Sequence, residues 1–280
     1  MKETIAVLMT VHDRKIKTLD CLNKLALQNL PEGYTYEVWL TDDGCTDGTR
    51  ESVMESFPDI HIVDGDGNLF WNRGMWKAWD AASKHKRYDY YLWLNDDTNL
   101  YDNAISELLK ESKEHNDTCN IVGSCQFEDH RGVSYGGFIS GRMIAPTGKA
   151  QRVDNFNGNI VLVPESVYQK IGNLDPYYSH GHGDTDYGLR AKKAGVESWI
   201  VGIFLGECDR HTKLKKCWDP DIPFGQRFNN LFQPTGYPPR ESFYFERKYK
   251  GIIIAMFHIV TLFARVCFPS LWCMMGKKRI

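Results

Sequence analysis

Two short acidic clusters are the residues of this chain best suited to chemistry. The first, at residues 95–97, reads Asn-Asp-Asp and follows the apolar run at 90–94, while the second places Asp184 and Asp186 at the start of a helix-like stretch. Carboxylates gathered at one edge of a sheet repel one another unless they bind a cation or take part in chemistry. Alternatively, each cluster caps a helix, because carboxylates there bind the free N–H groups of the first turn. The clusters therefore predict a cation-binding or proton-transferring site, with helix capping as the competing interpretation.

Strand and helix patterns alternate along the sequence that must position these clusters. Apolar runs bounded by polar residues predict strands, and apolar residues at helical spacing predict helices. We expect strands at 4–10, 36–41, 60–63, 90–94, 121–125 and 159–163, and helices at 15–28, 47–56, 72–85, 102–115 and 165–171. This alternation predicts an α/β fold with a mostly parallel, doubly wound sheet. Open sheets of this kind bind ligands at the carboxyl ends of their strands.

Polar residues follow each of the first three expected strands. They lie at 10–14, at 42–49 and at 64–68, and the second of these segments begins with Asp42, Asp43 and a glycine. A glycine turn can approach a ligand closely, and a carboxylate can accept a hydrogen bond from a ribose hydroxyl or a base N–H. We therefore expect a nucleotide to bind here, the alternative being a plain glycine turn followed by an Asp helix cap.

Composition narrows the class of protein. The chain has 280 residues, of which 42% are hydrophobic and 25% charged, and its formal net charge is -2, so a largely disordered chain and a nucleic-acid partner are not expected. Eight cysteines lack any C-x-x-C spacing, which favours reduced thiols in the cytoplasm. The N-terminal residues lack the pattern of a signal peptide. We therefore expect a cytoplasmic protein.

Three segments together resemble a known family. Residues 41–49 (Thr-Asp-Asp-Gly-Cys-Thr-Asp-Gly-Thr), 94–98 (Leu-Asn-Asp-Asp-Thr) and 183–190 (Gly-Asp-Thr-Asp-Tyr-Gly-Leu-Arg) are similar to the ordered motifs of family 2 glycosyltransferases of the GT-A fold. Members of the rhamnosyltransferase-like type, which build bacterial polysaccharides, are the closest in style. Each motif is weak alone, but the three in this order are specific. The resemblance extends from Ile5 to about His211.

The resemblance implies a metal-dependent, inverting transferase. It would move a sugar from a nucleotide-diphosphate donor to a hydroxyl of a glycan or lipid-linked acceptor in cell-surface polysaccharide synthesis. Asp184 corresponds to the general base, while Asp97 and a late histidine, His211, correspond to ligands of Mg²⁺ or Mn²⁺. Asn95 stands where the family motif has its first aspartate, which removes one negative charge and leaves the strength of metal binding open.

Further site residues lie within the matched segments and in other parts of the chain that are similar to the family. The residues expected to contact the donor are Thr10, His12, Arg14, Asp43, Asn72, Arg73 and Asp96, and those expected to contact the acceptor are Asn157, His182 and Asp186. Arg190 is interpreted either as a structural partner of Asp186 or as a diphosphate contact. Trp76 and Trp79 have a helical spacing that favours the core over a sugar platform.

The C-terminal part is expected to be an appendage. We predict one GT-A domain at 1–233, with a nucleotide-sugar half at 1–125 and an acceptor half at 126–233, followed by a linker and helical segment at 234–280. The apolar stretch 251–264 is shorter than the roughly 20 residues that span a bilayer. Lysines and an arginine on both sides favour a helix lying at the cytoplasmic membrane surface. The alternative is a helix that docks on the protein's own core or on a second copy.

Two other functions are compatible with parts of this pattern. A sugar-phosphate nucleotidyltransferase uses a similar sheet, but it would want a glycine-rich basic loop after the first strand, which residues 10–14 lack. A non-catalytic carbohydrate-binding protein derived from a transferase would not need both Asp97 and Asp184.

Overall fold

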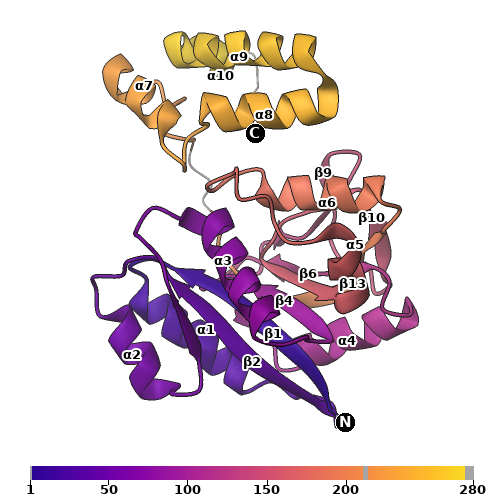
Figure 1. Cartoon of the computed structure of the whole chain (residues 1–280). Coiled ribbons are helices and arrows are strands. Elements are labelled where there is room, and N and C mark those ends of the chain that lie inside the picture. The colour runs from indigo at the N-terminus through magenta and orange to yellow at the C-terminus, as the bar shows by residue number, and fades with distance from the viewer. Residues whose placement is uncertain (1, 211–213, 275–280) are drawn as a thin grey trace. The chain divides into compact units, whose positions relative to one another are not determined.

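The computed structural model describes residues 2–210 and 214–274 (Figure 1). These residues form two compact units. The first contains residues 2–176 and 183–210, and the second contains residues 177–182 together with the C-terminal part from 214 onward. The predicted boundary between a domain at 1–233 and an appendage at 234–280 stays a prediction about independent folding.

The first unit is built on a mixed, mostly parallel sheet. Along the sheet the strands are β10 (Gln151–Val153), β13 (Ser198–Glu207), β6 (Asn120–Gln126), β12 (Ile160–Pro164), β4 (Tyr90–Leu94), β1 (Glu3–Val11), β2 (Tyr34–Asp42) and β3 (His61–Asp64). Strands β4, β1, β2 and β3 run parallel, and so do β6 and β13, whereas β12 is antiparallel to both of its neighbours. This is the α/β sheet that the alternating pattern predicts.

Helices cover both faces of this sheet (Figure 1). One face packs against α1 (Lys15–Ala26), α2 (Thr49–Ser56) and α4 (Ala104–Glu114), and the other against α3 (Phe70–His85), α5 (Glu165–Ile171) and α6 (Gly183–Lys193). The side chains of β1 alternate between the two cores, because successive residues of a strand point to opposite faces. Trp79 is fully buried in the second core, as its helical spacing predicts.

The parallel register brings the polar segments to one edge. Val11 pairs with Asp42, and Asp42 pairs with Asp64, so that β1, β2 and β3 end side by side. On the other side of β1, strand β4 leads directly into Asn95. The three polar segments and the first acidic cluster therefore meet at the carboxyl edge of the sheet, which is where the sequence places a ligand.

The region after Gln126 contains more strand than its glycine-rich sequence suggests. Short strand β7 (Val133–Tyr135) pairs with β6, and β8 (Gly137–Ile139) pairs with both β9 (Arg142–Met143) and β11 (Asn155–Phe156). Earlier in the chain, β5 (Asn99–Leu100) pairs with β13. Strand β13 itself was not predicted. Packing explains the two glycines of β13. A side chain at Gly202 would meet the backbone of Lys149, and a side chain at Gly206 would meet the backbone of Asn99.

The second unit is helical. It contains α7 (Phe224–Phe232), α8 (Pro239–Lys250), α9 (Ile252–Cys267) and α10 (Pro269–Met274). A small core of Cys217, Trp218, Leu231, Leu262 and Val266 joins α7, α9 and the segment before α7. Within the linker and helical segment expected at 234–280, helix α8 already begins at Pro239, whose fixed φ suits the first turn. Among the described residues no helix has both the length and the apolar character to cross a membrane.

Candidate active site

Arg14 bridges the two carboxylates of the first acidic cluster. Its Nη1 lies 3.0 Å from Asp96 Oδ1 and its Nη2 lies 2.5 Å from Asp97 Oδ2. Burial raises the pKa of Asp96 to about 7; the charge of Arg14 opposes this shift, and that of Asp97 adds to it. The structure thus places three predicted site residues from two strand ends in direct contact.

Asn95 is held in place by a tryptophan. Its side-chain oxygen accepts a hydrogen bond from the indole N–H of Trp71 at 2.7 Å, and its backbone N–H donates to the Asn159 carbonyl at 3.1 Å. The ring of Trp71 lies over Gly158, where an added side chain would approach the ring to 2.6 Å. Asn95 therefore serves as a neutral acceptor for Trp71, a contact that sequence reasoning did not find.

Asp184 lies beside this tryptophan-covered glycine. One carboxylate oxygen accepts the Gly158 N–H at 3.3 Å, and the other accepts the Thr185 N–H at 2.7 Å. Burial raises the pKa of Asp184, although these N–H groups and the Asn157 side chain oppose the shift. The first acidic cluster and Asp184 are therefore linked through Asn95, Trp71 and Gly158. A half-buried carboxylate with a raised pKa suits a general base.

Two close approaches fix the helix that begins at Phe70. A side chain at Gly74 would collide with Thr10 Oγ1, and one at Gly183 would collide with Asn72 Oδ1, so that both glycines are required for packing. Asn72 is fully buried and donates to the Asp175 carbonyl at 2.8 Å, while Arg73 Nε donates to the Pro176 carbonyl at 3.0 Å. Asn72 therefore packs against Gly183, the residue before Asp184, and its expected contact with the donor stays a prediction.

Asp43 organises a loop. Its buried carboxylate accepts the backbone N–H groups of Gly67 at 2.9 Å, Leu69 at 3.0 Å and Phe70 at 2.9 Å. His12 contacts the Asp43 carbonyl through Nδ1 at 2.6 Å and keeps about half of its side chain exposed. The carboxylate of Asp43 is thus engaged by the protein, whereas a direct contact with the nucleotide was expected. His12 remains exposed at this edge.

The remaining predicted residues lie in several places. Asp186 is fully buried and pairs with Arg190 at 2.8 Å, which is the structural partnership that one interpretation of Arg190 predicts, and the acceptor contact of Asp186 stays a prediction. Arg190 also donates to the carbonyls of Ile171 and Asn173. His182 belongs to the second unit, where its ring stacks on Phe245 at 4.6 Å. His211, the other expected metal ligand, lies outside the described residues.

One other group of potential metal ligands occurs within residues 2–210 and 214–274. It consists of Asp13, Cys45 and Asp47, and its carboxylates already accept backbone N–H groups, including that of Thr46 to Asp13 and that of Lys15 to Asp47. Burial raises the pKa of Cys45 to about 12, which keeps the thiol protonated. This group therefore closes the loop after β2, and we do not assign a metal to it.

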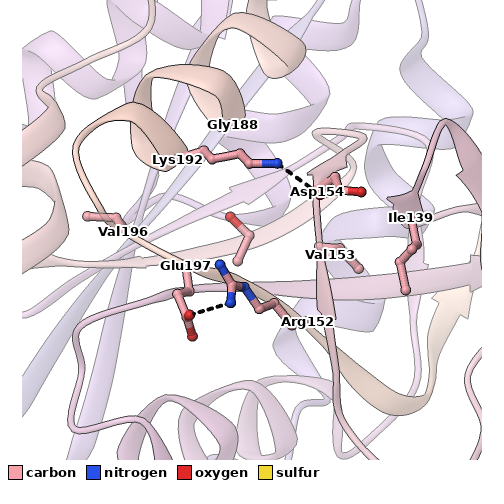
Figure 2. A pocket seen from close by; sticks show the side chains of 9 residues that line it. Ile139, Arg152, Val153, Asp154, Gly188, Lys192, Val196 and Glu197 are labelled. Atoms are coloured by element: carbon pink, nitrogen blue, oxygen red, sulfur yellow. Dashed lines mark hydrogen bonds and ion pairs between the residues drawn. The ribbon is translucent and has the colours of Figure 1, made fainter.

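A small pocket lies apart from the acidic clusters. It has a volume of about 170 Å³ and is formed by β8, β10, α6 and the start of β13 (Figure 2). Lys192 pairs with Asp154 and Arg152 pairs with Glu197, each at 2.9 Å, across this pocket. Because its charges are mutually paired and neither acidic cluster lines it, the pocket is not part of the candidate site.

Comparison with protein families identifies the chain. The sequence model of glycosyl transferase family 2 matches residues 6–163, which is more than half of the chain. The protein belongs to glycosyl transferase family 2. The matched range contains most of β1, the strands β2 to β4, the loop fixed by Asp43 and the first acidic cluster. Family membership supports a glycosyltransferase, generally an inverting one, that uses a nucleotide-sugar donor, and it favours this activity over nucleotidyl transfer.

The acidic pair of this glycosyltransferase suits a divalent cation. Asp96 Oδ2 is buried and accepts no hydrogen bond from the described residues, and Asp97 Oδ1 accepts a long hydrogen bond from the Cys208 thiol, at 3.6 Å. Mg²⁺ and Mn²⁺ prefer such oxygen ligands. Burial and the charge of Asp97 raise the pKa of Cys208 to about 12, so that this thiol remains protonated and is a poor ligand. Asp97, with Asp96 beside it, is therefore the group that would hold the ion.

Proposed function

We propose that this protein is a metal-dependent, inverting glycosyltransferase that moves a sugar from a nucleotide-diphosphate sugar to a hydroxyl of a glycan or lipid-linked acceptor. The observation that carries the proposal is the connected site in which Arg14, Asp96 and Asp97 are linked to Asp184 through Asn95, Trp71 and Gly158. Polysaccharide synthesis and a rhamnosyl donor remain the narrower proposal. They rest on the resemblance of residues 41–49, 94–98 and 183–190.

The proposed reaction is a single displacement at the anomeric carbon. The bond from that carbon to the diphosphate oxygen breaks while a bond to the acceptor oxygen forms, and the carboxylate of Asp184 takes the acceptor proton. A bound Mg²⁺ or Mn²⁺ would stabilise the negative charge of the diphosphate. Because the acceptor attacks the sugar directly, no second carboxylate is needed as a nucleophile, and the configuration is inverted.

A screen of nucleotide sugars with and without Mn²⁺ tests the proposed function. A ligand that binds only the folded state raises the melting temperature, so we expect one nucleotide sugar to stabilise the protein, and to do so more strongly with Mn²⁺. The measurement is thermal unfolding of the full chain, followed by product analysis with the stabilising donor. If no nucleotide sugar changes the melting temperature or is turned over, the proposed function is wrong.

We also propose that the protein works at the cytoplasmic face of a membrane and that the second unit binds there. Helix α9 packs one face on the small core through Leu262 and Val266, and Ala255 is buried on the same helix. Its other face exposes Ile253, Phe257 and Val260, whose side chains are 82%, 63% and 67% exposed. The last turn of α8, just before it, is rich in basic residues: Arg247, Lys248 and Lys250. Exposed apolar side chains beside basic ones suit an anionic lipid surface.

Charged substitutions on α9 should release the protein from anionic vesicles. The double variant Ile253→Glu/Phe257→Glu is expected to lower binding by at least about tenfold, because both side chains would lose apolar burial and the added charges repel the lipid. Vesicle flotation with phosphatidylglycerol measures binding. Leu27→Glu/Met54→Glu, at comparably exposed apolar positions of the first unit, is the matched control. Equal flotation of both variants and the wild type would rule out this surface. Point variants are preferable to deleting 251–280, since α9 also completes the core.

A further inference from the structure

Arg14 is the only cation that pairs with the acidic cluster among the described residues. Its guanidinium contacts Asp96 through one nitrogen and Asp97 through the other, at 3.0 and 2.5 Å. The two carboxylate side chains are 6% and 14% exposed, whereas that of Arg14 is 37% exposed. Two largely buried carboxylates are thus compensated by one cation that can reach solvent, which leaves a deficit of positive charge at this position.

The backbone of Arg14 is fixed independently of its side chain. The Arg14 carbonyl accepts both the N–H and the hydroxyl of Thr18 at 3.0 Å, at the point where α1 begins. The guanidinium can therefore leave the carboxylates by side-chain rotation without disturbing the helix. After such a rotation, Asp97 Oδ2 and the unbonded Asp96 Oδ2 would both be available to another cation.

We propose that Arg14 is an exchangeable counter-ion of the acidic pair, which a divalent cation displaces from Asp97 and which then binds the donor diphosphate. The inference rests on the proposed function for the identity of the donor. A guanidinium and a divalent cation cannot share one carboxylate oxygen closely, because like charges about 4 Å apart repel strongly where water is partly excluded. Metal binding alone must therefore break the Arg14–Asp97 ion pair, whereas metal binding with the donor gives the freed guanidinium a new partner.

This competition predicts coupled binding of metal and donor. The metal binds weakly to the free protein and more tightly when the diphosphate is present. The affinity for the donor rises by the same factor when the metal is bound. The neutral Asn95 increases the effect, since the site lacks a third carboxylate that could bind the ion while Arg14 stays in place. Arg14 thus makes a stable metal complex depend on the substrate.

The test measures Mn²⁺ alone, without donor, through the electron paramagnetic resonance signal of the free ion. Arg14→Gln should bind Mn²⁺ about tenfold or more tightly than the wild type, a size typical of coupling between sites. Lysine has a compact ammonium charge without the planar fork of arginine, so the Mn²⁺ affinity of Arg14→Lys should lie between those of the wild type and Arg14→Gln. Arg50→Gln is the matched control, since Arg50 is 36% exposed and also bridges two carboxylates, those of Asp42 and Asp64. It should leave Mn²⁺ binding unchanged.

Two comparisons separate this inference from the proposed function. Adding Asp97→Asn to Arg14→Gln should remove the gain in Mn²⁺ affinity, which shows that the ion binds where Arg14 was. The inference is overturned if the wild type, Arg14→Lys and Arg14→Gln bind Mn²⁺ with equal affinity. It is also overturned if none of the three proteins binds Mn²⁺ measurably. Failure of the wild-type protein to bind any nucleotide sugar overturns the proposed function instead, because that measurement does not involve Arg14 variants. Circular dichroism confirms that each variant is folded.

Discussion

Replacing Asp184 by Asn is expected to slow sugar transfer by about 100-fold or more, because the variant loses the group that accepts the proton of the acceptor hydroxyl. The amide keeps nearly the same size, and its oxygen can still accept the N–H groups of Gly158 and Thr185. Donor binding and the melting temperature should therefore change little. Transfer is measured with a donor identified by thermal shift, and donor affinity is measured separately by titration.

The pH dependence gives a second readout for the same residue. Burial raises the pKa of Asp184 above its ordinary value of about 3.9. The base must be ionised to accept a proton, so wild-type transfer should fall as the pH is lowered through this raised pKa. The residual activity of Asp184→Asn should lack that acidic limb. If the limb persists in the variant, another group is responsible for it.

Asp186→Asn is the control on the same helix. Asp186 is fully buried and paired with Arg190, so its loss should mainly lower the free energy of unfolding, by about 2 kcal/mol. Chemical denaturation measures this change. Near-normal turnover of Asp184→Asn, together with an inactive but well-folded Asp186→Asn, would assign the base role to Asp186.

The sequence predicts the central sheet well because its strands are apolar on both faces. Residues 90–94 are buried throughout, and their bounds agree with the prediction. Strand β13 is equally apolar, but Gly202 and Gly206 interrupt its pattern. Those glycines make room for backbone at 149 and 99, which only the folded chain brings near. Long-range packing of this kind leaves no periodic signal.

In the candidate site too, some features are visible in the local sequence and others depend on long-range packing. The motifs direct attention to Asp96, Asp97 and Asp184, since carboxylates next to apolar runs are visible in the sequence, and their roles stay predictions. What these groups contact depends on residues far along the chain. Arg14 lies more than 80 positions from the acidic pair, and Trp71 lies 24 positions from Asn95. The engagement of Asp43 by the 67–70 backbone was equally invisible, because it depends on how that loop folds.

Replacing Asp97 by Ala is expected to lower transfer at least about 1,000-fold, since the diphosphate would lose the ion that stabilises its developing charge. The Mn²⁺-dependent part of donor stabilisation should disappear as well. The matched control is Asn95→Asp, which keeps an oxygen to accept the Trp71 N–H and adds a third carboxylate to the cluster. It should be tolerated and should tighten Mn²⁺ binding.

Chelation decides whether Asp97 acts through a metal or through Arg14. If Asp97 holds the ion, excess EDTA should abolish wild-type transfer, and Mn²⁺ or Mg²⁺ should restore it. Asp97→Ala should not be restored by either ion, since no carboxylate remains at that position to bind it. Full wild-type activity in excess EDTA would contradict metal dependence. It would mean that the Arg14 guanidinium, which already neutralises the acidic pair at 2.5 and 3.0 Å, is the cation that stabilises the leaving diphosphate.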